Sequence, residues 1–487
     1  MAQKKFPPFG QLEFGMLDAA SEAAHSPELL IGGYYDCKSA AKDISMMRGW
    51  VLVGAKGAGK SAVLEHLALQ WAGSPMNFIS RWALTTFPIA DVTKLQVGST
   101  PGPSATCAAW QFQLLLKVFA SLIGDQGASY GGQVTTFHRD LVRLGLLEGE
   151  DLRTKFFDWS KTTVRFQVQG VGAEGGFGDA GATAVQLIEL LKRAISEIST
   201  DSQHLLAVDG LDSFFASSDD QWNSFGGLLD ATNEVNVFLR GTSLRATVLI
   251  AVREDMFTSA ESFDSAKMDD QTIRLSWSQD DQAEGESLWG MISQKARVSV
   301  RNPNDWLTLG DIRKAYLSEM VNRQLSVADY LLGYTRYLPR DMVALMNAVK
   351  KVHGGSGQVR VEQARRAVRS YSEGYFLAEI KNNLTKAFTS TGGTKTNDFL
   401  EELSTLDSPY FTSAELEKSL EGVLTSTEIR QLLRQLYRAG AIGVITRRNS
   451  VQHTNFSYRR AAGGGFKYKG RFLLHRALIE AWNIPRA

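Results

Sequence analysis

Apolar and polar positions follow two different rhythms along the first 285 residues. Short apolar runs bounded by glycine or charged residues are typical of buried strands. Segments whose apolar residues recur every three to four positions are typical of helices. The strand-like runs are 51–53, 204–208, 246–252 and 271–277, and the helical stretches are 63–71, 105–123, 185–198 and 220–239. Strands that alternate with helices predict an α/β fold with a parallel, helix-covered sheet.

A different order of elements follows. Pro339 suits a first helical turn, and the apolar residues that recur after it are Met342, Leu345, Met346 and Val349. We therefore expect a lid helix over 339–352. Further on, FTSAELEKSLEG and STEIRQLLRQLYRAG predict two helices separated by a turn, followed by two strands with a long basic loop between them. That order is winged helix-like.

A glycine-rich loop lies between the first predicted strand and the first predicted helix. Gly54 to Ser61 fits the pattern GxxxxGK followed by Ser or Thr, in the strand–loop–helix context that this motif requires. Glycines let backbone N–H groups face a polyphosphate, and the helix N-terminus adds a positive dipole end. We expect Lys60 to reach the β- and γ-phosphates and Lys56 to add positive charge. The predicted nucleotide-binding residues are Gly54, Lys56, Gly57, Ala58, Gly59, Lys60, Ser61 and Ala62.

A metal-side carboxylate is expected on another strand, because a P-loop holds Mg²⁺ with the help of an acidic residue. The strand pattern in HLLAVDGLDSFF ends in Asp209, at the strand end where open α/β sheets bind ligands. Ser61 and Asp209 are therefore the predicted metal residues, with ATP and Mg²⁺ as cofactors. Asp212 could position or activate the attacking water, or belong to an ordinary turn.

Two arginines are further candidates for contact with the nucleotide. Arg253 follows the strand over 246–252, where it could sense the γ-phosphate or face water. Arg340 lies near the start of the lid helix, where its planar fork matches phosphate oxygens, or where it is a surface residue of a core helix. The predicted catalytic set is Lys60, Asp209, Asp212, Arg253 and Arg340.

These motifs divide the chain into three predicted domains. They are a P-loop nucleotide-binding domain over 1–285 with an insertion at about 125–182, a helical lid over 286–390, and a winged-helix-like domain over 400–487. The predicted fold class is α/β, a P-loop NTPase parallel sheet with a helical lid, followed by an α+β winged-helix-like domain.

The insertion has a pattern of its own. Val164, Phe166 and Val168 alternate with polar residues as in a strand, and five glycines follow between Gly170 and Gly178. The insertion could contact a partner or be a surface excursion.

Composition indicates the cellular compartment of the protein more than its function. The chain is 44% hydrophobic and 22% charged, with a net charge of +1. Cys37 and Cys107 are too few for a disulfide framework and fit a reducing cytosol. The N-terminus lacks the apolar core of a signal peptide, and no window reaches the roughly 18 apolar residues that span a bilayer. We expect a cytoplasmic protein without membrane contact.

Charge is unevenly distributed along the chain. From Ser408 to Ala487, 13 Lys/Arg face five Asp/Glu, a local charge of +8 that leaves −7 for the remainder. The candidates for nucleic-acid contact are Arg447, Arg448, Arg459, Arg460, Lys467 and Lys469. A wing or recognition helix could present them to phosphates with salt-sensitive affinity. Alternatively, the basic surface docks on protein, including the acidic remainder of this chain.

Taken together, the loop, Asp209-Gly-Leu-Asp212, Arg253 and Leu338-Pro339-Arg340 resemble the AAA+/STAND lineage of P-loop ATPases. The DGLD stretch is similar to the second motif of NACHT-type STAND proteins. The upstream FGMLDAASE, Phe14 to Glu22, together with the loop also resembles a bacterial P-loop ATPase family whose members occur among phage-defence genes.

The resemblance implies an oligomer in which one arginine reaches the neighbour's site, with Arg240, Arg245 and Arg253 as candidates. The sequence departs from the lineage at Gly210, where many AAA+ proteins have Glu, and at Ser213, where NACHT-type motifs usually continue with an acidic residue. The catalytic base is therefore open, and turnover is expected to be slow.

Three functions remain in view. The leading prediction is an ATP-binding and ATP-hydrolysing oligomeric switch, in anti-phage defence together with a separate effector, since we find no nuclease or protease motif. The first alternative is a DNA-binding ATPase of replication, transposition or repair. The second is a nucleotide-gated scaffold with little hydrolysis.

Overall fold

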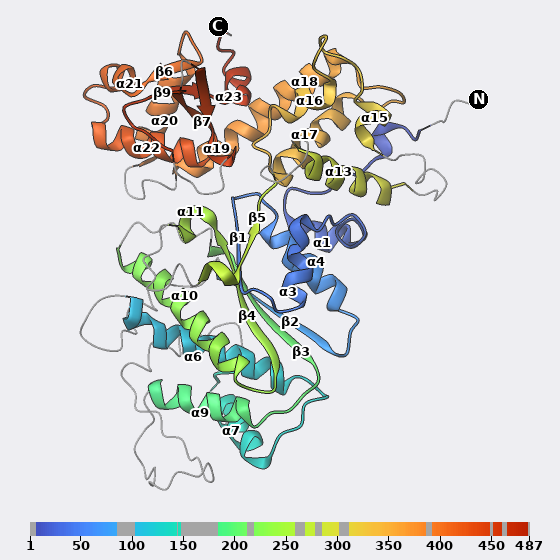
Figure 1. Ribbon diagram of the computed structural model, residues 1–487, viewed down its shortest axis with the longest axis vertical. Coiled ribbons are helices and arrows are strands. Elements are labelled where there is room, and N and C mark those ends of the chain that lie inside the picture. The colour runs from blue at the N-terminus through green and yellow to red at the C-terminus, as the bar shows by residue number, and fades with distance from the viewer. Residues whose placement is uncertain are drawn as a thin grey trace. The chain divides into compact units, whose positions relative to one another are not determined.

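The computed structural model describes residues 6–84, 103–143, 145–147, 184–211, 219–258, 268–277, 285–300, 311–385, 392–448, 451–459 and 465–485. The chain forms two compact units. The first unit comprises residues 1–40, 54–66 and 275–487, and the second comprises residues 41–53 and 67–274. The first unit therefore contains the glycine-rich loop and the C-terminal half of the chain, which runs from yellow to red in Figure 1.

A five-stranded sheet forms the centre of the second unit, with the strand order β2-β3-β4-β1-β5 (Figure 1). Its strands are β1 (Val51–Gly54), β2 (Asn77–Ala83), β3 (Gln203–Asp209), β4 (Arg245–Arg253) and β5 (Thr272–Leu275). β2 pairs with β3, and β3 with β4, in parallel. Next to them, the Ile250 N–H donates to the Trp50 carbonyl, 2.8 Å away, at the start of β1. The predicted parallel sheet is confirmed.

Four helices account for most of the second unit's apolar core. They are α6 (Pro103–Ile123), α7 (Gly132–Arg143), α9 (Ala184–Ser196) and α10 (Asp219–Arg240). Trp110 of α6 is fully buried, and its indole N–H donates to the Ser224 carbonyl of α10, 3.0 Å away. Burial of side chains such as Phe119 and Leu229, both 0% exposed, stabilises the unit by about 1.5–3 kcal/mol each.

One polar side chain fixes α10 to the sheet. The Asn236 amide nitrogen donates to the Val248 carbonyl of β4, and its oxygen accepts from the Val248 N–H, both at 2.8 Å. A buried amide that satisfies a backbone donor and acceptor together favours one position of the helix over others.

The segment Thr106–Ile123 of α6 is the one stretch among the described residues that is long and apolar enough to cross a membrane, judged by length and composition. The window is 72% buried inside the structure. Its apolar side chains, Trp110 and Leu114 among them, belong to the core of the second unit. The segment therefore has the burial of a core helix, although the sequence prediction found no such window.

The helical lid of the first unit is built from α13 (Glu286–Val298), α15 (Ile312–Tyr316), α16 (Val327–Leu332), α17 (Pro339–Val352) and α18 (Val361–Tyr371). A single π-turn (Ser372–Phe376) joins α18 to α19 (Leu377–Thr385), so these two helices form one continuous run. Pro339 is in the first turn of α17, and the predicted stripe from Met342 to Val349 is buried. The predicted lid helix is confirmed.

The N-terminal segment packs along this lid before α1 (Ala19–His25) and α2 (Pro27–Ile31). Phe9 and Phe14 are fully buried, and the Phe9 N–H donates to the Gly355 carbonyl, 2.9 Å away. Glu22 and Lys295 of α13 form an ion pair that is almost completely buried. The FGMLDAASE segment is therefore anchored to the lid at its two ends, Phe14 and Glu22, while Met16 and Leu17 between them are exposed.

The C-terminal domain has a four-stranded antiparallel sheet in the order β6-β9-β7-β8. Its elements are α20 (Gly392–Ser404), β6 (Tyr410–Thr412), α21 (Ser413–Ser419), α22 (Ser426–Arg438), β7 (Ile442–Arg448), β8 (Val451–Asn455), β9 (Arg471–Leu474) and α23 (Arg476–Ala481). Capping boxes begin α21 at Thr412 and α22 at Thr425. The winged-helix-like fold is confirmed.

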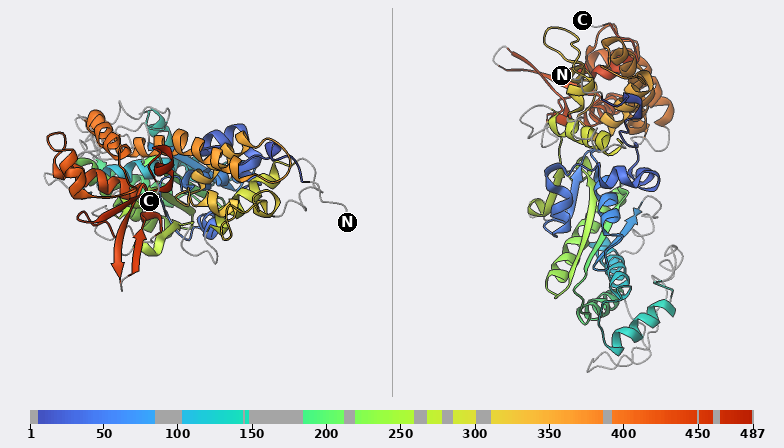
Figure 2. Two further views of the ribbon diagram at one scale, coloured as in Figure 1. Left: turned by 90° about the horizontal axis from the view of Figure 1, so that it is seen from above. Right: turned by 90° about the vertical axis from the view of Figure 1, so that its right-hand side faces the viewer.

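Three strands lie outside the prediction. β6 has only three residues, and β2 is an edge strand whose side chains are mostly half-buried. β8 forms a hairpin with β7, which projects from the domain in Figure 2. Its sequence VQHTN has a single apolar residue, Val451, which is exposed. Backbone hydrogen bonds therefore hold β8, and no apolar alternation marks it.

Several predicted features lie outside the described residues. They are the strand pattern from Val164 to Val168 with the glycines that follow it, Asp212, Ser213 and Arg460. The Arg448 side chain is also outside the description, although its backbone belongs to β7.

Candidate nucleotide-binding site

The loop after β1 has the backbone that its glycines predict. All four residues of β1 are buried, and the chain leaves it at Gly54 to enter α4 (Lys60–Trp71). Gly57 and Gly59 have φ angles of 87° and 100°, in the region that side chains with a Cβ rarely adopt. The Trp277 indole N–H donates to the Ala58 carbonyl, 2.8 Å away, and holds the turn from outside. The loop therefore has a defined backbone conformation within the first unit.

Lys60 lies inside this loop. Its side chain is nearly buried, and its ammonium donates to the carbonyls of Gly54 at 3.0 Å and Ala55 at 3.2 Å. Ser61 and Ala62 occupy the first turn of α4, and Ser61 is exposed. An ammonium group and a helix N-terminus beside a glycine turn make a concentrated positive site for an anion. The loop thus fits the polyphosphate of a nucleotide, and the Ser61 hydroxyl is a hard oxygen ligand of the kind that Mg²⁺ prefers.

The lid helix α17 begins against the loop. The Arg340 N–H donates to the Gly57 carbonyl, 3.4 Å away, and its guanidinium donates to the Leu17 carbonyl at 3.1 Å. A Cβ added at Gly57 would lie 3.3 Å from the Arg340 Cβ. Glycine at this position therefore serves both the φ angle and the close approach of the lid. The structure brings the Arg340 backbone to the loop, and the contact of its guanidinium with a nucleotide stays a prediction.

Lys56 is engaged with a helix that sequence analysis did not connect to the loop. Its ammonium forms an ion pair with Glu379 of α19 at 2.7 Å and donates to the Asn383 side chain at 3.1 Å. The side chains of Lys56 and Glu379 are 19% and 12% exposed, so the pair is largely shielded from water. No local pattern could have revealed this contact, because Asn383 lies 327 residues beyond Lys56 in the sequence.

In the second unit, Asp209 and Arg253 lie at one edge of the sheet. β4 is the direct neighbour of β3, and the register pairs Val208 with Ile250, so both strands end at the same side. The Arg253 guanidinium makes two hydrogen bonds to Asp255, at 3.0 and 2.7 Å. This arrangement places Arg253 beside the strand of Asp209, as predicted, with its charge already paired.

The backbone after Asp209 explains one departure from the AAA+ pattern. The Asp209 carboxylate accepts from the Gly210 N–H at 2.7 Å, and Gly210 has a φ angle of 82°. That conformation favours glycine and would be strained for the Glu that many AAA+ proteins have there.

The other two candidates for an arginine that reaches a neighbour lie at the opposite end of β4. Arg245 is its first residue, is exposed, and donates to the Gln203 side chain at the start of β3, 3.1 Å away. Arg240 ends α10 five residues earlier and donates to the Asn236 carbonyl at 3.3 Å. The structure therefore separates Arg253 from Arg240 and Arg245. Which of the three reaches a neighbouring subunit stays a prediction.

The basic residues of the C-terminal domain divide into two groups. Arg447, Lys467 and Lys469 are exposed. Arg459 is exposed as well, but it lies over the Tyr337 ring, 5.4 Å from its centre, and donates to the Tyr337 hydroxyl at 3.3 Å. Arg459 is therefore occupied by a lid residue.

Sequence analysis missed three arginines on α22, the second helix of the winged-helix-like domain. Arg430, Arg434 and Arg438 recur every four residues and are exposed. The guanidinium groups of Arg430 and Arg434 lie 5.5 and 5.8 Å from the ring centres of Tyr468 and Phe466. Their spacing in the sequence was a usable sign of one helix face.

Two other groupings in the second unit do not resemble a nucleotide site. Ser121, His204 and Asp125 form a row, with 2.9 Å between Ser121 Oγ and His204 Nδ1 and 3.5 Å between His204 Nε2 and Asp125. His204 is 2% exposed and the Phe78 ring stacks on it, which shuts out a substrate.

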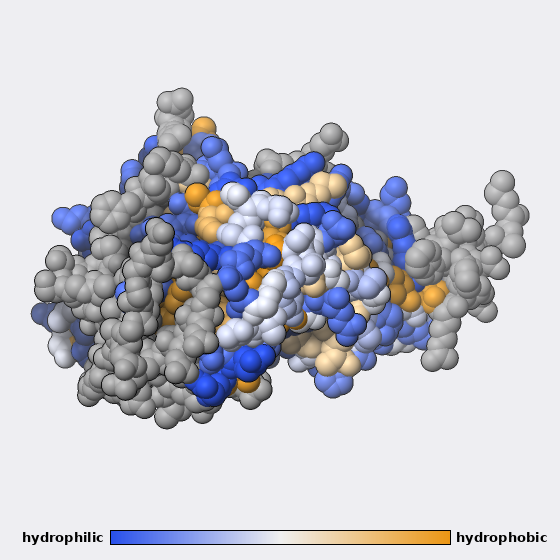
Figure 3. Space-filling view, turned by 90° about the horizontal axis from the view of Figure 1, so that it is seen from below, coloured by the Kyte–Doolittle hydropathy of each residue, from blue (hydrophilic) through white to orange (hydrophobic). Residues whose placement is uncertain are grey.

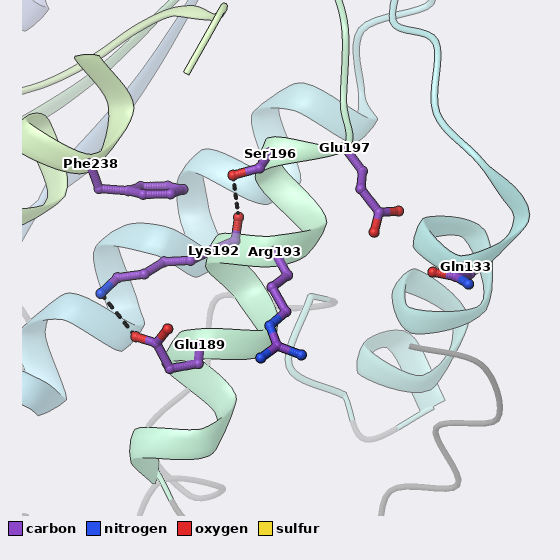
Figure 4. A pocket seen from close by; sticks show the side chains of 7 residues that line it. All are labelled: Gln133, Glu189, Lys192, Arg193, Ser196, Glu197 and Phe238. Carbon is purple, nitrogen blue, oxygen red and sulfur yellow. Dashed lines mark hydrogen bonds and ion pairs between the residues drawn. The ribbon is translucent and has the colours of Figure 1, made fainter. Parts of the chain in front are cut away.

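The second grouping is an open hollow of about 570 Å³ lined by α7, α9 and α10 (Figure 4). Its polar groups partly satisfy each other, since Lys192 pairs with Glu189 at 3.1 Å and the Ser196 hydroxyl donates to the Lys192 carbonyl at 2.9 Å.

In Figure 3, polar residues dominate the coloured part of the face shown, and apolar ones form small groups.

Among the residues that the structure describes, no three or more His, Cys, Asp or Glu side chains form a metal-binding group. A Mg²⁺ ion bound with a nucleotide takes only one or two protein ligands, because phosphates and water supply the others. The fold and the loop together define an α/β protein with the fold of the P-loop NTPases.

Comparison with known proteins adds little to this class. No protein-family model and no curated protein matches the chain. The chain is similar to the Cdc6p structure from Pyrobaculum aerophilum, at 12% identity over 86% of this chain and 89% of that chain, with a TM-score of 0.31. It is also similar to the ORC2 protein of Aeropyrum pernix in ADPNP–ADP complexes, at 10% identity over 87% and 88%, with a TM-score of 0.30. At these values neither likeness carries an argument, and the class rests on the chain's own sheet and loop.

Proposed function

We propose that this protein is an AAA+ ATPase that binds ATP with Mg²⁺ at the glycine-rich loop and hydrolyses it slowly. The observation that carries the proposal is the loop itself, in which Gly57 and Gly59 adopt positive φ angles and the Lys60 ammonium donates to the carbonyls of Gly54 and Ala55. A loop with this backbone turns N–H groups toward an anion, and its lysine has a short path from those carbonyls to a phosphate.

Each predicted residue has a role in this proposal. Lys60 and the loop amides bind the phosphates, Ser61 and Asp209 hold the magnesium side, and Arg340 brings the lid to the nucleotide. Bound Mg²⁺ would neutralise phosphate charge that develops during hydrolysis. Arg253 responds to the γ-phosphate only after it leaves Asp255, which fits slow turnover. Asp212 stays the predicted base.

The biological setting is also part of the proposal. We infer a cytoplasmic homo-oligomer that works with a separate effector, because the motifs of this chain account for nucleotide chemistry alone. Cys37 and Cys107 are buried thiols, which fits a reducing compartment. The role in anti-phage defence stays a prediction from the sequence resemblance.

The test compares Lys60→Ala with Lys351→Ala, since Lys351 is an exposed lysine of the lid. Loss of a charged hydrogen-bond donor should weaken ATP binding at least about 10-fold and abolish turnover. Lys351→Ala should behave as wild type. Calorimetry with ATP and Mg²⁺ gives the affinity, and phosphate release gives the turnover. Wild-type binding and turnover in Lys60→Ala would reject the proposal.

A second candidate function, a DNA-binding ATPase, is favoured by the three arginines of α22. In winged-helix-like folds the corresponding helix is placed to enter a groove of DNA, and exposed Arg447, Lys467 and Lys469 add positive charge to the same domain. Neutralising Arg430 and Arg434 should weaken DNA binding and reduce its dependence on salt. DNA affinity equal to that of wild type would assign these arginines to protein contact.

The scaffold alternative differs in one measurable respect. A nucleotide-gated scaffold would purify with trapped ATP and release negligible phosphate, whereas the proposed ATPase turns over measurably.

A further inference from the structure

One face of the helical run from the π-turn into α19 reaches both the lid and the glycine-rich loop. Tyr375, Glu379 and Asn383 recur every four residues, so they share one face. The Tyr375 hydroxyl donates to Asp341 of the lid helix at 3.1 Å, while Glu379 and Asn383 hold Lys56 of the loop. All of these residues belong to the first unit. The face therefore connects two parts of the nucleotide site.

The adjacent face of the same run, one residue further along at each step, belongs to the winged-helix-like domain. Phe376, Ile380 and Leu384 are fully buried, and α19 packs against α20, α22 and α23. The Phe376 ring stacks on His475 at the start of α23, with 4.7 Å between ring centres. Movement of α19 away from the loop would therefore displace the domain that it helps to form.

The start of the lid helix makes a second connection to the same domain. Arg336 and Asp341 form an ion pair at 2.6 Å, with side chains 5% and 0% exposed. Burial alone would raise the pKa of Asp341. The charge and hydrogen bonds of Arg336 outweigh the effect of burial, so the pKa of Asp341 is lowered. Arg336 also donates to the Ala439 carbonyl after α22, 3.3 Å away. The domain is therefore held at α17 independently of Lys56.

We propose that Lys56 is a second phosphate-binding lysine of the loop, and that Glu379 and Asn383 hold it away from the phosphates, so that ATP binding and the docking of α19 oppose each other. The inference rests on the proposed function and adds two positioning residues to its site. The Lys56–Glu379–Asn383 contact is named the α19 latch below.

The physical reason is competition for one ammonium group. Phosphates that enter the loop carry negative charge, which attracts Lys56 and repels the Glu379 carboxylate that lies 2.7 Å from it. The shielded position of the pair strengthens both effects relative to water. By thermodynamic linkage, this competition is reciprocal. The latch weakens ATP binding by the same factor by which bound ATP weakens the latch.

The decisive variant is Glu379→Gln, which removes the charge and keeps the side chain's size. ATP affinity should rise about five-fold, the change expected when one partly shielded ion pair no longer competes. Amide hydrogen exchange over residues 377–384 should be fast without nucleotide. In wild type the same segment should exchange slowly alone and faster with ATP and Mg²⁺. Glu373→Gln is the matched control, because Glu373 is an exposed carboxylate two turns earlier and should behave as wild type.

Lys56→Met separates the two roles of the lysine. Exchange over 377–384 should again be fast without nucleotide, but ATP affinity should fall, because the phosphate contact is lost as well. Affinity that rises as in Glu379→Gln would show that Lys56 serves only the latch and would overturn the proposal.

The outcomes distinguish this inference from the proposed function. Unchanged ATP affinity and unchanged exchange in Glu379→Gln would overturn the α19 latch while ATP binding by wild type stands. Absence of ATP binding by wild type and by every variant would overturn both. Asn383→Ala keeps the ion pair and removes only the amide contact with Lys56. It should therefore change ATP affinity and exchange in the same direction as Glu379→Gln, by a smaller amount. Unchanged exchange over residues 377–384 in both variants would reject the latch, and the second variant keeps the test valid if one of them folds poorly.

Discussion

His475 begins the last helix as a neutral side chain, and this state should make the protein sensitive to acid. Its Nδ1 accepts from the Ala477 N–H at 3.2 Å, so that nitrogen carries no proton, and its Nε2 donates to the Thr335 carbonyl at 3.3 Å. Burial, and after it the charge of Arg336, lower the pKa of His475 from 6.5 to about 3. Protonation would break the contact that starts α23 and place a second positive charge beside Arg336.

The magnitude follows from proton linkage. Because the pKa is lower in the folded protein, the unfolded chain takes up the proton first as the pH falls. The stabilisation is complete above pH 6.5 and is lost progressively as the pH falls toward 3. At pH 5.0 the histidine of the unfolded chain is largely protonated, and the free energy of unfolding should be about 2 kcal/mol lower than at pH 7.5 from this residue alone.

The assay is urea unfolding at pH 7.5 and 5.0 for wild type and His475→Asn. Asparagine keeps an oxygen that can cap α23 but carries no titrating proton. The loss of unfolding free energy between the two pH values should be about 2 kcal/mol smaller in the variant. Burial also lowers the pKa of His66 and His204, and these residues titrate in both proteins. An equal loss in wild type and variant would refute the reasoning.

Three further changes test the parts that position the site. Arg336→Met leaves the buried Asp341 carboxylate without its charge partner and should lower the free energy of unfolding by about 3–5 kcal/mol. The double variant with Asp341→Leu should recover most of that loss, and urea unfolding that gives equal losses would contradict the ion-pair account. Gly59→Ala meets no atom within 4 Å but must adopt a φ of 100°, so it should cost about 1–3 kcal/mol and weaken ATP binding; wild-type affinity by calorimetry would argue against the need for glycine. Thr425→Ala removes the capping box of α22 and should cost about 1 kcal/mol, whereas the exposed Thr427→Ala should cost less; equal midpoints for all three proteins would show that the cap is unimportant.

The sequence predicted the elements whose patterns are local. β1, the glycine loop and α4 are contiguous, so an apolar run, a motif and a helical period identify them together. The positions of Asp209 and Arg253 at strand ends were predicted in the same way, because each ends a buried apolar run. The stripe of α17 is visible since one helix face enters the core.

The remainder depends on contacts that no local pattern contains. Glu379 looks like any charged residue of a helix, and only the fold brings it to Lys56. The same is true of Arg336, whose partner Asp341 is close in sequence but whose burial comes from the winged-helix-like domain. β8 has no apolar alternation, so its pairing with β7 is decided by the hairpin.

Hydrogen exchange of the loop amides tests the central claim most directly. If the N–H groups between Gly54 and Ser61 bind a polyphosphate, exchange of residues 55–61 should slow markedly when ATP and Mg²⁺ are added to wild type, and Lys60→Ala should show no such change. Exchange over these residues that is identical with and without saturating ATP and Mg²⁺ in wild type would contradict the account.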